Sequence, residues 1–235
     1  MLVSITGIKK FILGLANKIK TYKEDLPTDD KTPMENENGS QTGSNEATEP
    51  IEYVIFPQKV INITQRANGA FSHKNLQAWD LADIDSNIQQ AFAPCTVIVL
   101  AKPTSNANTV LFGSCDEQGN PRAVMTENGT KRILTFALTH DDYIGDIKIG
   151  EIYRSGEKIY DEGKAGKATG NHIHIEVAEG WQYEKIRDEF GHYRIKNIIP
   201  IGSIFHKLKG WNEIKNANGY TFKEVERRFY DGNNI

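Results

Sequence analysis

The feature that most constrains the fold is a series of short apolar runs that begins near residue 51. Each run is rich in β-branched or aromatic residues, and turn residues such as Gly, Asn and Pro separate the runs. Runs of this kind indicate the strands of an antiparallel sheet. We therefore expect a mainly β domain over residues 51–210, with strands in the runs that start near residues 53, 60, 96, 109, 122, 133, 158 and 172.

The segments on either side of this β-rich part have a different composition. Residues 1–23 carry five lysines and no acid, and an apolar stripe at helical spacing is formed by Ile5, Ile8, Ile12, Leu15 and Ile19. This pattern predicts an amphipathic helix that docks on a partner protein, on a membrane surface or on its own domain. Residues 24–50 hold eight acids and almost no large apolar residue, which predicts a flexible acidic linker. In the C-terminal extension, residues 211–235, the run TFKEVERRFY at 221–230 predicts a short helix.

Charge and hydropathy argue against several classes of protein. The formal net charge of the 235 residues is −3, so no overall basic field favours nucleic acid. No apolar run approaches the roughly 18 to 20 residues that span a bilayer. Lys9 and Lys10 interrupt the apolar N-terminus and no small-residue cleavage pattern follows, so we expect no secretory signal.

Two cysteines, Cys95 and Cys115, are too few for a disulfide framework and form no CxxC zinc pattern. If residues 95–101 and 109–115 form a hairpin, a register in which paired residue numbers sum to 210 sets the cysteines opposite each other. Two interpretations remain open, namely two reduced and buried cysteines or a cross-strand disulfide.

The run HIHIEV, residues 172–177, holds the first candidate for chemistry. Side chains alternate between the faces of a strand, so His172 and His174 project on the same side. Glu176 should face that side too, either as a partner that orients an imidazole or as a solvated carboxylate. On its own, a pair of histidines in a strand is a weak signal, because a catalytic zinc usually has three protein ligands.

Further candidates lie earlier in the chain. His73 precedes Asp80, which stands between Trp79 and Leu81, and a carboxylate buried among large apolar residues needs a metal or a cation as its partner. His140 ends the run ILTFALTH, where a rigid strand opens into a loop. The alternatives are a capping carboxylate at Asp80 and a surface histidine at His140. We expect the other two histidines, His192 and His206, to be ordinary surface or boundary residues.

The order of these pieces resembles the lysostaphin-like zinc metallopeptidases, the M23 or LytM-type family, which cut peptide bridges in bacterial cell walls. The resemblance covers about residues 55–180, and its most specific block is GKATGNHIHIEV at 166–177. The other matching pieces follow in family order: Ser72–His73 with Asp80, Ala93–Pro94 before TVIVL, Leu138–Thr139–His140, and the glycine-bearing stretch 150–163.

The resemblance implies that His73, Asp80 and His174 are zinc ligands and that His140 and His172 are catalytic histidines without a metal bond. Such an open zinc site activates water for attack on an amide. The implied fold is a twisted antiparallel sheet with a groove, and the implied function is a zinc-dependent metalloendopeptidase of peptidoglycan cross-links, as in phage-type cell-wall lysins. Without a secretory signal, such an enzyme would reach the wall by lysis, in a virion or in another assembly.

One departure and two alternatives accompany this resemblance. Many family members place three residues between the first histidine and its aspartate, whereas six lie between His73 and Asp80, so Asp83 and Asp85 are rival ligands. A cupin signature would instead combine His172 and His174 with Glu179, but its second half is absent and it leaves His73, Asp80 and His140 unexplained. An inactive relative that binds peptidoglycan would keep the fold without the chemistry.

Overall fold

The computed structural model describes residues 51–83 and 88–226. The predicted N-terminal helix (1–23), the acidic linker (24–50) and the rival ligand Asp85 lie outside the described residues, as do residues 227–235.

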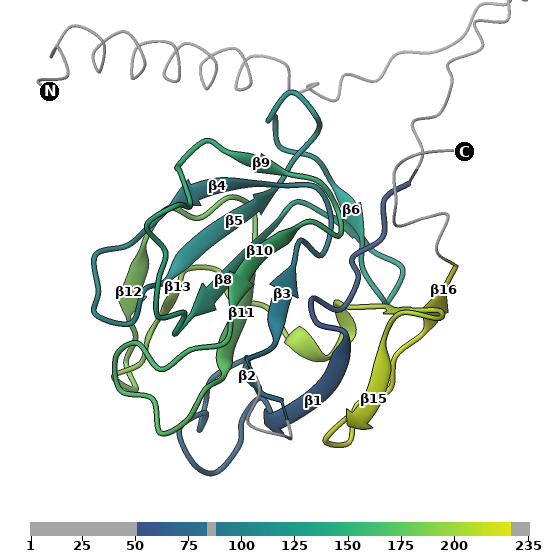
Figure 1. Cartoon of the computed structure of the whole chain (residues 1–235). Coiled ribbons are helices and arrows are strands. Elements are labelled where there is room, and N and C mark those ends of the chain that lie inside the picture. Colours follow the sequence, from purple (N-terminus) through teal and green to yellow (C-terminus); the bar gives the residue numbers. More distant parts are fainter. Residues whose placement is uncertain (1–50, 84–87, 227–235) are drawn as a thin grey trace, which may run out of the picture. The chain divides into compact units, whose positions relative to one another are not determined.

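An eight-stranded sheet forms the centre of the described part, in the strand order β15-β1-β2-β11-β8-β5-β4-β9 (Figure 1). Neighbouring strands are antiparallel except β1 and β15, which are parallel. The mainly β architecture predicted from the apolar runs is thereby confirmed. The strands of this sheet are β1 (Val60–Gln65), β2 (Ala78–Leu81), β4 (Val97–Ala101), β5 (Val110–Ser114), β8 (Leu134–Thr139), β9 (Ile152–Tyr153), β11 (Ile173–Glu179) and β15 (Glu213–Asn216).

Four two-stranded ladders surround this sheet. They are β3 (Gln90–Phe92) with β10 (Lys158–Asp161), β6 (Val124–Met125) with β7 (Lys131–Arg132), β12 (Lys185–Arg187) with β13 (Tyr193–Ile195), and β14 (Lys207–Leu208) with β16 (Glu224–Val225). The 3-10 turn η1 (Ile201–Ser203) is the one helical element in the described ranges, which therefore contain no helix long enough to cross a membrane.

The strand prediction differs from the structure in several parts. The predicted strand near residue 53 forms isolated bridges at Tyr53 and Ile55, and the short strands β3, β7, β9 and β12 to β15 lie outside the predicted runs. Strand β2 was not predicted, because its four residues AWDL are too few to show a period and its pairing with β1 and β11 defines it. The predicted C-terminal helix is wrong over residues 221–226. There Phe222 packs on the main core, and β16 pairs in parallel with β14 while Val225 packs near Ile55 and Leu208.

Alternating side chains divide the sheet into two faces. Ile173, Ile175 and Val177 of β11 join Trp79 and Phe136 in the main core on one face. A smaller apolar cluster covers part of the other face and contains Leu100, Leu111, Ala137, Ala178 and Ile195. The smaller cluster covers only part of the second face, and polar side chains can occupy the rest.

The hairpin of β4 and β5 forms as predicted, but its register differs by one residue. Val97 pairs with Ser114, and Ile98 pairs with Gly113. The amide of Cys115 therefore donates to the carbonyl of Thr96, and Cys95 lies one position away from it. Both cysteines are buried and free.

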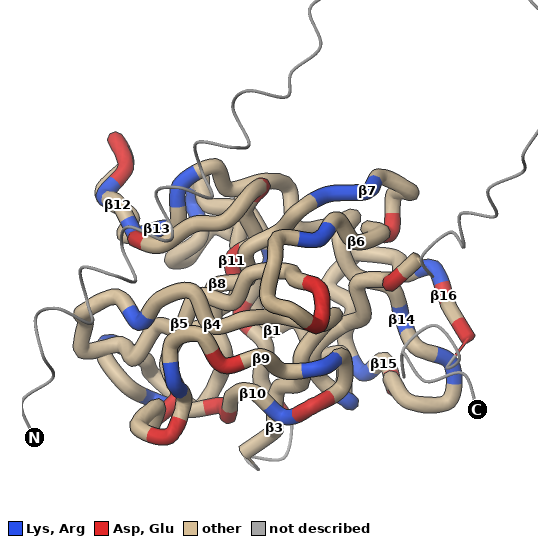
Figure 2. The backbone as a smooth tube through the Cα atoms, turned by 90° about the horizontal axis from the view of Figure 1, so that it is seen from above, with Lys and Arg blue, Asp and Glu red and all other residues tan. Residues whose placement is uncertain are grey.

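Charged residues of both signs are interspersed around the described part of the chain (Figure 2). Stretches with Lys or Arg and stretches with Asp or Glu both occur along the outer strands and loops in this view. This distribution agrees with the absence of a basic field in the composition.

Gly113 provides a test of packing on the second face. A Cβ at this position would lie 2.6 Å from Nε1 of Trp181 and 2.7 Å from Cδ1 of Leu100. We expect Gly113→Ala to lower the free energy of unfolding by about 1–3 kcal/mol, the usual cost of overpacking. Denaturant unfolding would measure it. Gly170→Ala is the control, since nothing lies within 4 Å of the added methyl group there, and an equal loss in both variants would contradict the packing argument.

Candidate metal centre

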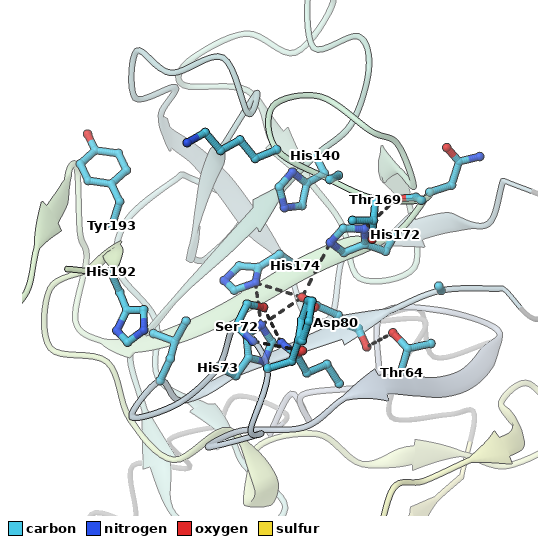
Figure 3. Close-up of a pocket in the computed structure, with 18 residues that line it drawn as sticks. Thr64, Ser72, His73, Asp80, His140, Thr169, His172, His174, His192 and Tyr193 are labelled. Atoms are coloured by element: carbon cyan, nitrogen blue, oxygen red, sulfur yellow. Dashed lines mark hydrogen bonds and ion pairs between the residues drawn. The ribbon is translucent and has the colours of Figure 1, made fainter. Parts of the chain in front are cut away.

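Three side chains from different parts of the chain meet on the second face of the sheet. Asp80 of β2 lies directly opposite His174 in the antiparallel pairing with β11, and His73 comes from the loop before β2. Nε2 of His73 lies 3.1 Å from Oδ1 of Asp80 and 3.1 Å from Nδ1 of His174, and Nδ1 of His174 lies 3.0 Å from Oδ1 of Asp80. One ligand atom of each residue therefore converges on one point (Figure 3).

In His73 and His174, the ring nitrogen that points away from the cluster is held by a hydrogen bond. That bond determines whether the nitrogen that faces the cluster carries a proton or a lone pair. Nδ1–H of His73 donates to the carbonyl oxygen of Arg66 at 3.3 Å, and Nε2–H of His174 donates to the carboxylate of Glu176 at 3.1 Å. Because a carbonyl or a carboxylate can only accept, each ring directs a lone pair at the cluster. Two lone pairs and a carboxylate oxygen about 3 Å apart repel each other unless a metal ion or a shared proton lies among them.

The electrostatics of the cluster favour positive charge among its groups, carried by a proton when no metal ion is bound. Burial would raise the pKa of Asp80, but hydrogen bonds with His174 and His73 hold it well below its usual range. Burial would lower the pKa of His174, yet hydrogen bonds with Asp80 and Glu176 raise it. A tetrahedral ion with ligands about 2.0–2.1 Å away would separate those ligands by about 3.3 Å, close to the spacing found here. His73, Asp80 and His174 could therefore hold a metal ion.

His140 and His172 lie beside this cluster and are also anchored through one nitrogen. Nδ1 of His140 donates to the carbonyl of Ala165 at 2.7 Å, and Nδ1 of His172 donates to the carbonyl of Gly170 at 2.9 Å. Their ring centroids are 4.5 Å apart, and Nε2 of His172 lies 3.9 Å from Oδ1 of Asp80. All five residues proposed from the sequence thus line one open pocket of about 510 Å³ (Figure 3).

The backbone of His140 is unusual. Its φ is +96°, whereas the other non-glycine residues with positive φ in the described ranges are all asparagines. The amide of His140 donates to the carbonyl of Ala107 at 2.9 Å, and its own carbonyl accepts from Ala165 at 3.0 Å. Gly163 packs against this turn so closely that a Cβ would overlap the carbonyl oxygen of His140. A strained histidine held from several sides is a feature of functional sites.

Glu176 is the side chain for which the sequence left two interpretations. It is fully buried, and both of its oxygens are used: Oε1 contacts His174 and the ammonium of Lys185 at 2.8 Å, and Oε2 accepts from the amide of Ile195 at 2.7 Å. Burial opposes ionisation, but Lys185 and His174 lower the pKa of Glu176 to about 2. Glu176 therefore orients His174 and is not a solvated carboxylate.

Sequence reasoning missed the hairpin of β12 and β13, which borders this site. Lys185 begins it, and no motif connects that lysine with the histidines. His192, expected to be an ordinary surface or boundary histidine, lines the pocket, and its Nδ1 lies 3.3 Å from Oδ2 of Asp188. His206 is buried elsewhere, with Nδ1 donating to the carbonyl of Val54.

The structure places Asp83 and Glu179 outside the cluster. Asp83 is not among the clustered ligands in the described ranges, and its amide donates to the buried Glu162. Glu179, which a cupin would need, pairs with Arg132 at 2.6 Å. It lies five residues along β11 from His174, which is about 17 Å at the rise of a strand.

The burial of His140 predicts a pH dependence. Burial is the main cause that lowers its pKa to about 4. Since an exposed histidine titrates near 6.5, the unfolded chain binds more protons between these values. The stabilising contribution of neutral His140 should therefore be complete above about pH 6.5 and be lost as the pH falls toward 4. NMR titration of the metal-free protein would measure the pKa, and His140→Gln should weaken the loss of stability on acidification; titration of His140 near 6.5 would contradict this.

Part of this chain is similar to known proteins. No family model matches it. It is 31% identical over 158 residues to morphogenesis protein 1 of Bacillus phage B103, a match that covers 65% of this chain and 41% of that protein. Among solved structures, a zinc-containing peptidase from Vibrio cholerae (18% identity, TM-score 0.37) matches over 56% of this chain and 37% of that chain. Csd3 of Helicobacter pylori (16% identity, TM-score 0.38) matches over 66% of this chain and 35% of that one. The chain thus spans less than half of the length of each of these proteins.

Proposed function

We propose that the described part of this chain is a zinc-dependent metalloendopeptidase that cleaves peptide cross-links of bacterial peptidoglycan. One observation carries the proposal: the ligand atoms of His73, Asp80 and His174 lie 3.0–3.1 Å from one another, and His140 and His172 line the same pocket. Three ligands and an open side are the arrangement of a catalytic rather than a structural zinc.

His73, Asp80 and His174 would hold the ion, and two histidines would move protons. Zinc supplies a Lewis acid that activates water and polarises a carbonyl group. His172 and His140 are tied through Nδ1 to backbone carbonyls, so each keeps Nε2 for the reaction. His140 is neutral at pH 7 because burial lowers its pKa to about 4, so its Nε2 keeps a lone pair that can accept a hydrogen bond from the attacking water. The neighbouring imidazole, once protonated, can donate to the oxyanion as it forms.

The substrate is inferred from the resemblance and from the pocket. The matching motifs belong to enzymes that cut wall peptides, and the pocket of about 510 Å³ is open to the surface. The exposed side chains of Phe71 and Lys167 lie at its border and would contact that chain. For the route to the wall we propose lysis, a virion or another assembly, with the enzyme acting on the outer side of the cell.

An inactive module that binds peptidoglycan is the second possibility, since it would keep the same fold. It would not require His140 to be held in a strained conformation beside the ligands. Zinc content together with wall cleavage separates the two possibilities.

The ligand set predicts a loss of metal and activity together. Asp80→Ala or His174→Ala should abolish stoichiometric zinc binding and the cleavage of purified walls, because two remaining ligands hold zinc poorly. Elemental analysis would measure zinc, and zymography with and without a chelator would measure cleavage. Asp83→Ala is the matched control and should retain both. Zinc bound at full occupancy by Asp80→Ala would show that the carboxylate ligand lies elsewhere.

The two histidines without a proposed metal bond predict a different outcome. His172→Ala or His140→Ala should leave zinc bound and slow turnover by about 10²–10⁴-fold, the scale for losing a positioned base or oxyanion donor. Mass spectrometry of the released peptides would give the rate and identify the bond cut. Wall cleavage at an unchanged rate by His172→Ala would contradict the role assigned to it.

A further inference from the structure

A buried lysine lies behind the proposed metal site. Lys185, the first residue of β12, is 9% exposed. Lysine is rarely buried without a partner, because removing an ammonium group from water is costly. The residue also lies beyond the stretch 55–180 that resembles the peptidase family, so the family motifs give it no role.

Lys185 contacts the carboxylate that anchors a proposed ligand. Its Nζ donates to Oε1 of Glu176 at 2.8 Å, and the same oxygen accepts from Nε2 of His174 at 3.1 Å. The amide of Ile195, in the partner strand of the hairpin, donates to Oε2 at 2.7 Å. One hairpin therefore holds both oxygens of Glu176, and neither can turn without losing a hydrogen bond.

This arrangement fixes which nitrogen of His174 faces the cluster. With Nε2–H directed at a carboxylate that cannot move, the ring keeps Nδ1 within 3.1 Å of His73 and Asp80. If the carboxylate turned away, the ring could rotate about its Cβ–Cγ bond, which would put the carbon Cδ2 in place of Nδ1, or its proton could move from Nε2 to Nδ1. Either change would remove the lone pair that faces the cluster. Lys185 also balances the charge of Glu176, so that the carboxylate is not left as an unpaired buried anion.

We propose that Lys185 is a positioning residue of the metal centre, acting through Glu176 to orient His174 for metal binding. The inference rests on the metal-binding part of the proposed function and deepens it. The hairpin of β12 and β13 is then a support of the site, supplied from outside the segment that carries the recognisable motifs.

The test is the affinity of the full chain for zinc, measured by competition with a chromogenic chelator and without any peptide substrate. Lys185→Met keeps the length of the side chain but removes the ammonium, and we expect zinc to bind about 10–100-fold more weakly, the usual effect of losing a partner of a metal ligand. Lys185→Arg, which can still donate to Oε1, should recover most of the affinity. Lys196→Met is the matched control, because Lys196 is exposed one residue beyond β13, and its affinity should not change.

Two further measurements separate positioning from folding. The absorption bands of the Co²⁺-substituted protein report the ligand geometry, and we expect them to shift in Lys185→Met but not in Lys196→Met. If Lys185→Met does not fold, the double variant Lys185→Met with Glu176→Gln removes both buried charges and should also bind zinc weakly. Folded Lys185→Met, or the double variant, with the affinity and cobalt spectrum of the original protein would overturn the inference alone. An original protein that binds neither Zn²⁺ nor Co²⁺ would overturn the proposed function and this inference with it.

Discussion

The pairing of β2 with β11 is the constraint on which the rest of the site depends. It sets Asp80 directly opposite His174, so two groups from distant parts of the sequence become cross-strand neighbours on a rigid sheet. The same register places Trp79 opposite Ile175 on the core face. A slip of one residue would exchange Trp79 with Asp80 and bury the carboxylate in the main core, so the energy of the core enforces the geometry of the polar cluster.

The same kind of hydrogen bond orients the four clustered histidines. Each ring gives one nitrogen to a fixed acceptor, which is a backbone carbonyl for His73, His140 and His172 and a carboxylate for His174. The other nitrogen is then available in a known direction and protonation state. Backbone acceptors belong to loops held by the sheet, so the fold itself sets the chemistry of the imidazoles.

The sequence predicted those features of the metal centre that depend on neighbouring residues in the chain. His172, Ile173 and His174 alternate within one strand, so their faces followed from the sequence, and the order of the motifs brought His73, Asp80 and His140 into the same hypothesis. Strand β2 escaped prediction, because four residues show no period and their neighbours impose the extended conformation. Lys185 could not be found either, since it meets Glu176 through a turn of the chain that no motif marks. At the C-terminal end, Phe222 and Val225 have helical spacing, but each fills a different apolar cluster, and tertiary packing decided against the helix.

The hairpin of β12 and β13 also bears on where a working unit ends. Every residue of the resemblance, and every clustered histidine, lies before residue 181. A fragment cut there would keep the full ligand set but leave the carboxylate of Glu176 without the donors Lys185 and Ile195. The shortest fragment that preserves the metal centre must therefore include the donors to Glu176, so it extends to residue 195 or beyond. Motif limits are thus a poor guide for dissecting this chain into parts.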